Sequence, residues 1–322
     1  MLASDKRLKK ISESAIAVGR TGSPLRWLLP GLLLLLILWV GAGPSFGQGG
    51  FSTENPAASL RAKYSVLKDK LGHNHFQRPL YMDSGENGNE LRGEIHAVVD
   101  YPYPTTVSAL KDAQAWCDIL SLHLNIKYCR AQTNNSPRKL LVYVGRKYEQ
   151  PLEKASPIEF TFSAAESSPG YLRLVLNARQ GPFGTQDYKI LLEAIPAERE
   201  GTFIRLSYAY ETSLMAKLAL QCYLNTLGSS KVGFTVVGSK SDGQPIYTGD
   251  MRGVVERNTM RYYLAVEAYL SALSIPEERR LDARLQNWFV ATERYSLQLH
   301  EIDQAAYLAM KHREHQRQVV MP

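Results

Sequence analysis

The feature that most constrains the fold is a series of short alternating segments separated by turn signals. Within each segment apolar and polar side chains alternate, which is the pattern of a β-strand with one buried face. The segments lie at 139–147, 158–165, 170–178, 187–196 and 202–211, and a shorter one lies at 126–131. Adjacent hairpins of this kind form an antiparallel meander. Because a meander has one apolar face, another layer has to cover it.

Helical patterns lie on both sides of this series. Residues 56–71 predict a helix, because apolar side chains recur there at helical spacing, and SGENGNE at 84–90 predicts a turn-rich break. The further elements that we expect, in order, are a strand at 91–102, two short helices up to residue 125, a buried helix at 213–228, a strand at 232–238, a long helix at 251–273 and helices beyond Ser274. This order predicts an α+β domain.

The order of elements and the segment GEIHAVVDYPYPTTVSALKDAQAWCD, residues 93–118, resemble the helix-grip superfamily. That superfamily includes the START domains, the birch-pollen-allergen-like proteins, the polyketide cyclases and the coenzyme Q-binding proteins. The resemblance implies an antiparallel sheet wrapped on a long helix, with a hydrophobic cavity for lipids, sterols, quinones or polyketides. We assign 251–273 as the grip helix, although the elements expected at 213–238 depart from the superfamily's pattern.

The expected division of the chain follows from these elements. Residues 48–90 are predicted to be a linker and a helix that precedes the domain, residues 91–273 the helix-grip domain, and residues 274–322 a C-terminal helical extension. Charges in the extension balance, so we interpret its polar face as an ordinary solvated surface.

Residues 1–47 have the sequence pattern of a leader for export. Six basic residues precede an uncharged run, and the 17 residues from Trp27 to Gly43 are strongly apolar. This pattern predicts either a cleaved signal peptide or an uncleaved anchor in the inner membrane. Both interpretations place the domain outside the cytoplasm, because the basic flank stays inside. The leader also carries four of the chain's seven net positive charges, so we expect no nucleic-acid partner.

Cys117, His123 and Cys129 are spaced six residues apart, in a chain with three cysteines. A metal site and a catalytic thiol are both disfavoured, because six residues of helix leave two side chains about 120° apart around the axis. A disulfide between Cys117 and Cys129 fits better. The chain reverses direction between the two residues and can bring their Cα atoms close enough, and an exported protein can be oxidised. Cys222 is predicted to be a buried free thiol.

We expect six candidate ligand-binding residues around the predicted cavity: Trp116, His123, Tyr208, Arg252, Glu256 and Tyr263. Arg252 or Arg261 is a candidate anchor for an acidic head group at the cavity mouth. The alternative is that the charges of this helix form ordinary solvated pairs. His123, on an apolar segment, has the alternative of a satisfied core histidine.

Three functions remain open. The first is the binding or shuttling of a hydrophobic, lipid-like molecule without a cofactor or metal. The second is a cyclase or hydrolase that uses His123, Asp118 or Glu256. Common catalytic motifs such as GxSxG are absent from the sequence, but an acid–base cyclase leaves no such motif. The third is an assembly role for 276–322, which predicts that Trp288, Phe289 and Tyr295 face solvent.

Overall fold

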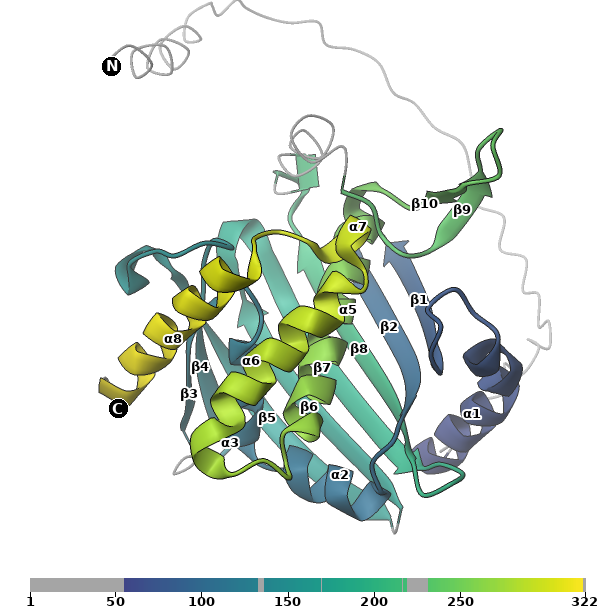
Figure 1. The fold of residues 1–322 in the computed structure, drawn as a ribbon, viewed down its shortest axis with the longest axis horizontal. Helices are drawn as coiled ribbons and strands as arrows, with labels where there is room; N and C mark the ends of the chain where they lie inside the picture. The colour runs from purple at the N-terminus through teal and green to yellow at the C-terminus, as the bar shows by residue number, and fades with distance from the viewer. Residues whose placement is uncertain (1–54, 133–135, 169, 216, 219–230, 321–322) are drawn as a thin grey trace, which may run out of the picture. The chain divides into compact units, whose positions relative to one another are not determined.

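The computed structural model describes residues 55–132, 136–168, 170–215, 217–218 and 231–320 (Figure 1). The leader, Cys222 and most of the helix expected at 213–228 lie outside these residues. Within the described part of the chain, no helix has both the length and the apolar character needed to cross a membrane.

The centre of the fold is an eight-stranded sheet in which all neighbouring strands are antiparallel. The strands are β1 (Leu80–Asn87), β2 (Glu90–Val99), β3 (Ile126–Gln132), β4 (Arg138–Val144), β5 (Ser156–Ser168), β6 (Tyr171–Gln180), β7 (Thr185–Pro196) and β8 (Thr202–Thr212). Strands β3 to β8 form the expected meander, and β2 pairs with β8 to give the order β1-β2-β8-β7-β6-β5-β4-β3.

Strand β1 differs from the prediction. The segment at 84–90 was expected to be a break, but its first half belongs to an edge strand, and only Gly88 and Asn89 form the turn to β2. Gly88 has a φ of 61°, a conformation that glycine adopts without strain. Much of this edge strand is exposed, so it lacks the apolar alternation of a half-buried strand. The sheet therefore begins at Leu80, before the boundary expected at residue 91.

Helices cover both faces of the sheet. They are α1 (Pro56–Gly72), α2 (Tyr103–Leu110), α3 (Ala113–Ser121), α5 (Asp250–Ser271), α6 (Glu277–Glu293), α7 (Ser296–Leu299) and α8 (Gln304–Val320), with short 3₁₀ turns at Leu152–Lys154 and Pro182–Gly184. The small hairpin β9 (Val236–Ser239) and β10 (Pro245–Tyr247) precedes α5. This is the predicted helix-grip arrangement: α5 packs against β1, β2 and β8, and α6 lies over α5 (Figure 1).

Strand β8 shows how the two faces are separated. Its residues Ile204, Leu206 and Tyr208 belong to the main core under α5, whereas Phe203 belongs to a second core with the apolar side of α1. Tyr64 of α1 stacks on Phe203 with the ring centroids 4.6 Å apart. Successive side chains of the strand thus pack alternately against the helices on the two faces of the sheet.

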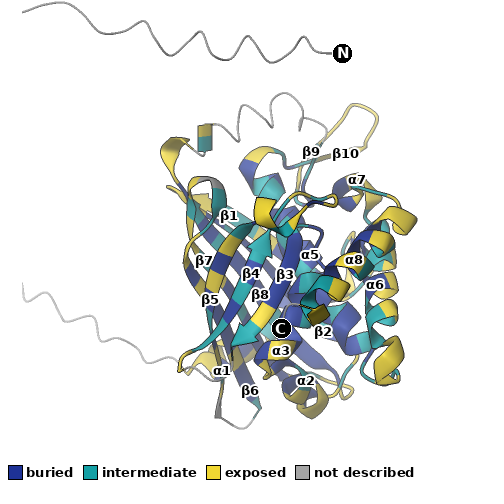
Figure 2. Cartoon of the chain, turned by 90° about the vertical axis from the view of Figure 1, so that its left-hand side faces the viewer, coloured by how far each residue is buried: buried dark blue, intermediate teal, exposed yellow. Residues whose placement is uncertain are grey.

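The C-terminal helices pack on the body. Trp288 of α6 is 1% exposed and its Nε1 donates to the carbonyl of Arg261 at 3.1 Å, while the Tyr295 hydroxyl donates to the carbonyl of Phe76. Phe289 is partly buried against Tyr307. The expectation that these aromatic residues face solvent is therefore wrong. Exposed residues lie instead along the outer side of α6 (Figure 2).

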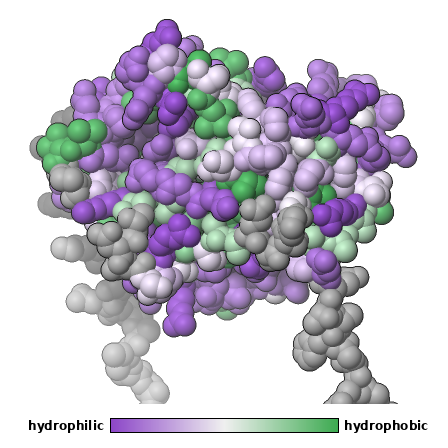
Figure 3. All heavy atoms as spheres, turned by 90° about the horizontal axis from the view of Figure 1, so that it is seen from below, coloured by the Kyte–Doolittle hydropathy of each residue, from purple (hydrophilic) through white to green (hydrophobic). Residues whose placement is uncertain are grey.

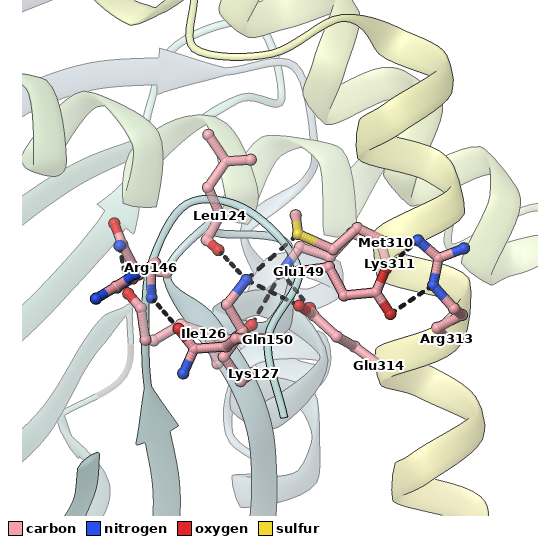
Figure 4. Close-up of polar contacts among 12 residues, drawn as sticks. Leu124, Ile126, Lys127, Arg146, Glu149, Gln150, Met310, Lys311, Arg313 and Glu314 are labelled. Atoms are coloured by element: carbon pink, nitrogen blue, oxygen red, sulfur yellow. Dashed lines mark hydrogen bonds and ion pairs between the residues drawn. The ribbon is translucent and has the colours of Figure 1, made fainter. Parts of the chain in front are cut away.

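Helix α8 is fastened to the loop between α3 and β3 by a buried ionic network (Figure 4). Lys311 donates to the carbonyls of His123 and Ile126 at 2.7 and 2.9 Å and to Glu314 at 2.8 Å. Lys127 of β3 donates to the same carboxylate at 2.9 Å. The loop that carries His123 is thereby held by the C-terminal helix.

The side of the molecule seen in Figure 3 is mostly hydrophilic, and its hydrophobic residues form small separate groups. Scattered apolar residues of this kind are normal on a solvated surface.

Candidate ligand cavity

A partly enclosed cavity of about 140 Å³ lies between the sheet and α5. Alternate residues of three strands, β4, β5 and β7, line it, because successive side chains of a strand face opposite sides. Its walls include Val142, Val144, Ile158, Phe160, Tyr188, Ile190 and Tyr208 from the sheet, Asn258 and Tyr262 from α5, and Leu120, His123, Asn125 and Ile126 from α3, β3 and the loop between them. The lining is mainly apolar with a few polar groups, which is the usual composition of a small-molecule site.

His123 presents one nitrogen that has no partner. The backbone N–H of Asn125 donates to its Nδ1 at 3.1 Å, so the neutral ring carries its proton on Nε2. The side chain is buried, and the side chain of Asn258 is near enough to raise the pKa of His123 slightly, but by bond geometry Nε2 has no hydrogen-bond partner among the described residues. Burial, together with the positive charges of Arg261, Lys311 and Lys147, keeps the pKa of His123 well below its usual value. The ring is therefore a neutral hydrogen-bond donor that needs an acceptor.

Four tyrosines line or adjoin the cavity. Tyr208 packs on Tyr262 with ring centroids 5.1 Å apart, and Tyr188 stacks on Tyr210 at 5.3 Å. The Tyr188 hydroxyl donates to Thr185 Oγ1 at 2.8 Å. Burial raises the pKa of Tyr208 and Tyr262, so their hydroxyls stay protonated donors.

Two of the six predicted binding residues, His123 and Tyr208, line the cavity, and four do not. Trp116 lies in the core and donates from Nε1 to the carbonyl of Leu110 at 3.0 Å. Tyr263 is adjacent to Tyr262 on α5 but points elsewhere, and its hydroxyl donates to Glu267 at 2.7 Å. Consecutive residues of a helix differ by about 100° around the axis, so only one of the two tyrosines can face the sheet here.

Arg252 and Glu256 have a structural role. The fully buried Glu256 carboxylate accepts from the N–H of Thr235 at 2.9 Å, from its hydroxyl at 2.6 Å and from the Ser84 hydroxyl. Arg252 donates to Ser84 Oγ at 3.0 Å. These bonds fasten the segment before β9, and strand β1, to the first turns of α5. The sequence prediction placed Arg252 and Glu256 at the cavity, and the structure places both away from it.

The predicted catalytic set also does not come together. Asp118 pairs with Arg284 at 2.8 Å on the outer side of α3, and Glu256 is bound as described above. Only His123 of the three lines the cavity. Asp118 and Glu256 therefore cannot serve a cyclase or hydrolase in this cavity, and of the three candidates only His123 remains there.

The predicted disulfide between Cys117 of α3 and Cys129 of β3 is confirmed, with the Cα atoms 5.2 Å apart. The described residues contain no group of three or more histidine, cysteine or acidic side chains that could hold a metal ion. The cysteines therefore link two elements that form one wall of the cavity.

No known protein family matches the chain, and no curated protein matches it. Solved structures similar to it include a protein of Thermus thermophilus (13% identity, 57% of this chain and 99% of that chain, TM-score 0.33). A second is truncated norcoclaurine synthase of Thalictrum flavum (11% identity, 45% of this chain and 92% of that chain, TM-score 0.30). A third is the Zhui aromatase/cyclase of a Streptomyces species (12% identity, 67% of this chain and 96% of that chain, TM-score 0.29). This chain has a helix-grip fold. The strand order of the sheet and the packing of α5 on β1, β2 and β8 define this fold.

Proposed function

We propose that this protein binds a small hydrophobic molecule in the cavity between the sheet and α5. The observation that carries the proposal is the buried Nε2 of His123, which has no hydrogen-bond partner among the described residues and belongs to the wall of a mainly apolar cavity. Buried polar groups are almost always hydrogen-bonded in folded proteins, so a buried donor left without a partner in a cavity wall favours a bound acceptor.

The cavity volume limits the size of the ligand. Sites for drug-sized ligands have volumes of about 300 to 1,000 Å³, and this cavity has about 140 Å³. An apolar cavity of about 150 Å³ holds benzene. A whole lipid does not fit in a space of this volume. We therefore narrow the lipid-like ligand expected from the sequence to a molecule, or part of one, about as large as a single ring.

We also propose that binding takes place outside the cytoplasm, in the periplasm or at the outer side of the inner membrane. The leader at 1–47 supports this location by its basic start and apolar run. The Cys117–Cys129 disulfide is compatible with it, because such bonds persist in oxidising compartments. Thiol labelling of the protein in its native cells tests the location, and finding both cysteines reduced there would contradict it.

Calorimetry with toluene and benzamide tests the binding proposal. The full chain is expected to bind at least one of them, and Val144→Phe, which fills the cavity from β4, should abolish binding. Val66→Phe makes the same change at a position that is 75% exposed on α1 and should leave binding intact. The proposal is wrong if neither probe binds and organic extracts of the purified protein contain no enriched hydrophobic molecule.

A further inference from the structure

A second pocket, of about 410 Å³, lies on the face of the sheet that α1 covers. Strands β2, β7 and β8 form its floor, and the first half of α1 forms its wall. The residues that line it include Glu94, His96, Glu193, Arg205, Ser59 and Lys63. Ile95 and Ala97, on either side of His96, belong to the core under α5, so His96 faces the opposite side of the sheet. This pocket, called the outer pocket below, is therefore separate from the ligand cavity.

The charges that line the outer pocket cancel. Arg205 donates from Nη2 to Glu94 at 2.6 Å and from Nη1 to Glu193 at 2.8 Å. Its guanidinium thereby holds the two carboxylates on the floor. Lys63 adds the second positive charge from α1. Two carboxylates and two cations leave the lining without a net charge.

The groups around this lining do not change the balance. Arg92 donates to Glu94 at 2.9 Å, and the opposite charge of Asp83 acts on His96. Burial is the main cause that lowers the pKa of His96 to about 4, so its ring is uncharged at neutral pH. A charged ligand would lose its hydration in this pocket without meeting an excess of the opposite charge. The outer pocket therefore favours a neutral ligand.

His96 brings two ring nitrogens without hydrogen bonds to the floor of the outer pocket. The side chain is 1% exposed, and neither Nδ1 nor Nε2 has a hydrogen-bond partner among the described residues. Nε2 lies 3.4 Å from a Glu94 oxygen, and a carboxylate at this position favours the tautomer with the proton on Nε2. Nδ1 is then a buried acceptor that lacks a donor. Since buried polar atoms are almost always hydrogen-bonded, it indicates a bound donor group.

Arg205 supplies the complementary donor. Its Nε is also buried and has no partner in the described part of the chain. His96 and Arg205 lie opposite each other on β2 and β8, so their side chains are neighbours on one face of the sheet. A hydroxyl group both donates and accepts, whereas a carboxylate only accepts and an ammonium group only donates. The two side chains together therefore fit hydroxyl groups.

We propose that the outer pocket binds a neutral polyhydroxylated molecule about as large as a monosaccharide, with hydroxyl groups that donate to His96 and accept from Arg205. The volume of about 410 Å³ lies within the range of about 300 to 1,000 Å³ for small-molecule sites. It is far larger than the share of about 30 Å³ that one water molecule takes in the liquid. The carboxylates of Glu94 and Glu193 can accept from further hydroxyl groups. This site is independent of the ligand proposed for the cavity under α5.

Ligand-observed NMR titration of the full chain at neutral pH tests this assignment. The neutral probes are glucose, galactose, mannose and myo-inositol, and the charged probes are glucuronate and glucosamine. At least one neutral probe is expected to bind with a dissociation constant of about 10 mM or lower, and more tightly than both charged probes. His96→Phe keeps the ring and removes both nitrogens, so it should weaken this binding about tenfold or more.

A matched pair of variants on α1 locates the site. Ser59→Phe places a ring in the outer pocket from an exposed position and should abolish binding of the neutral probe. Ser65→Phe makes the same change at an exposed position of the same helix, outside the lining, and should leave binding intact. Because Ser59 is exposed, this variant keeps the test decisive even if His96→Phe loses stability.

Four results would overturn the assignment. The first is that none of the neutral probes binds. The second is that glucuronate or glucosamine binds more tightly than every neutral probe, which would show a site for a charged ligand. The third is equal loss of binding in Ser59→Phe and Ser65→Phe, and the fourth is unchanged binding in a folded His96→Phe variant.

Discussion

His96 should make the stability of this protein depend on pH. It lies on β2 beneath α1, is 1% exposed, and stacks on Phe203 with ring centroids 5.9 Å apart. Nε2 lies 3.4 Å from a Glu94 oxygen, but neither ring nitrogen makes a hydrogen bond within the described residues. Burial is the main cause that lowers the pKa of His96 to about 4, against 6.5 for a free side chain.

The sign of the effect follows from that lowered pKa. Below pH 6.5 the unfolded chain takes up a proton at His96 before the folded chain does, so stability is present above this pH and is lost as the pH falls toward 4. One pKa unit corresponds to about 1.4 kcal/mol. Between about pH 7 and about pH 5, His96 alone should therefore remove about 2 kcal/mol from the free energy of unfolding.

Urea unfolding of the His96→Phe variant at these two pH values measures the effect. Phenylalanine keeps the ring packing and cannot be protonated, so the loss of stability on acidification should be about 2 kcal/mol smaller than in the unsubstituted protein. His123 has a lowered pKa of the same sign, but it is present in both proteins and cancels in the comparison. His73→Phe, at an exposed position, is the control and should change little. An equal pH dependence in the unsubstituted protein and in His96→Phe would refute the reasoning.

Two further predictions concern the links between elements. Replacing Cys117 and Cys129 by serine should lower the free energy of unfolding by about 3 kcal/mol, because the disulfide closes a short loop in the unfolded chain; urea unfolding with and without reductant checks this, and equal stability would contradict it. Glu314→Gln should cost about 3 kcal/mol by leaving the buried Lys311 without its carboxylate. Glu149→Gln breaks the exposed pair to α8 and should cost less than about 1 kcal/mol in the same assay, and similar losses in both variants would refute the role of burial.

The strands of the meander could be predicted because apolar and polar side chains alternate along them and turns separate them. In β5 the polar side is largely exposed, whereas β8 has no exposed residue and its Phe203 is buried against α1. The same rule fails for β1, where Gly85 and Glu86 are as polar as a turn, since an edge strand buries little of its length. Strand β1 forms because it pairs with β2 over its whole length, and the local sequence does not show this pairing.

The candidate site was harder to predict than the fold. Tyr208 lies on β8 and His123 in the apolar loop after α3, so the apolar pattern indicates that both are buried, and both line the cavity. On α5 almost every face is buried, because the sheet covers one side and α6 the other. A helix buried all round has no apolar stripe that could show which of Tyr262 and Tyr263 faces the sheet.

The attachment of α8 has a consequence for the order in which the protein is completed. Synthesis runs from the N-terminus, so every strand of the sheet is made before Lys311, which holds the carbonyls of His123 and Ile126. One wall of the cavity is therefore finished only after the whole sheet has been made. A protein shortened at Asp303 should keep the strand signal in circular dichroism and lose ligand binding. An incomplete or clipped chain would then be unable to capture and retain its ligand.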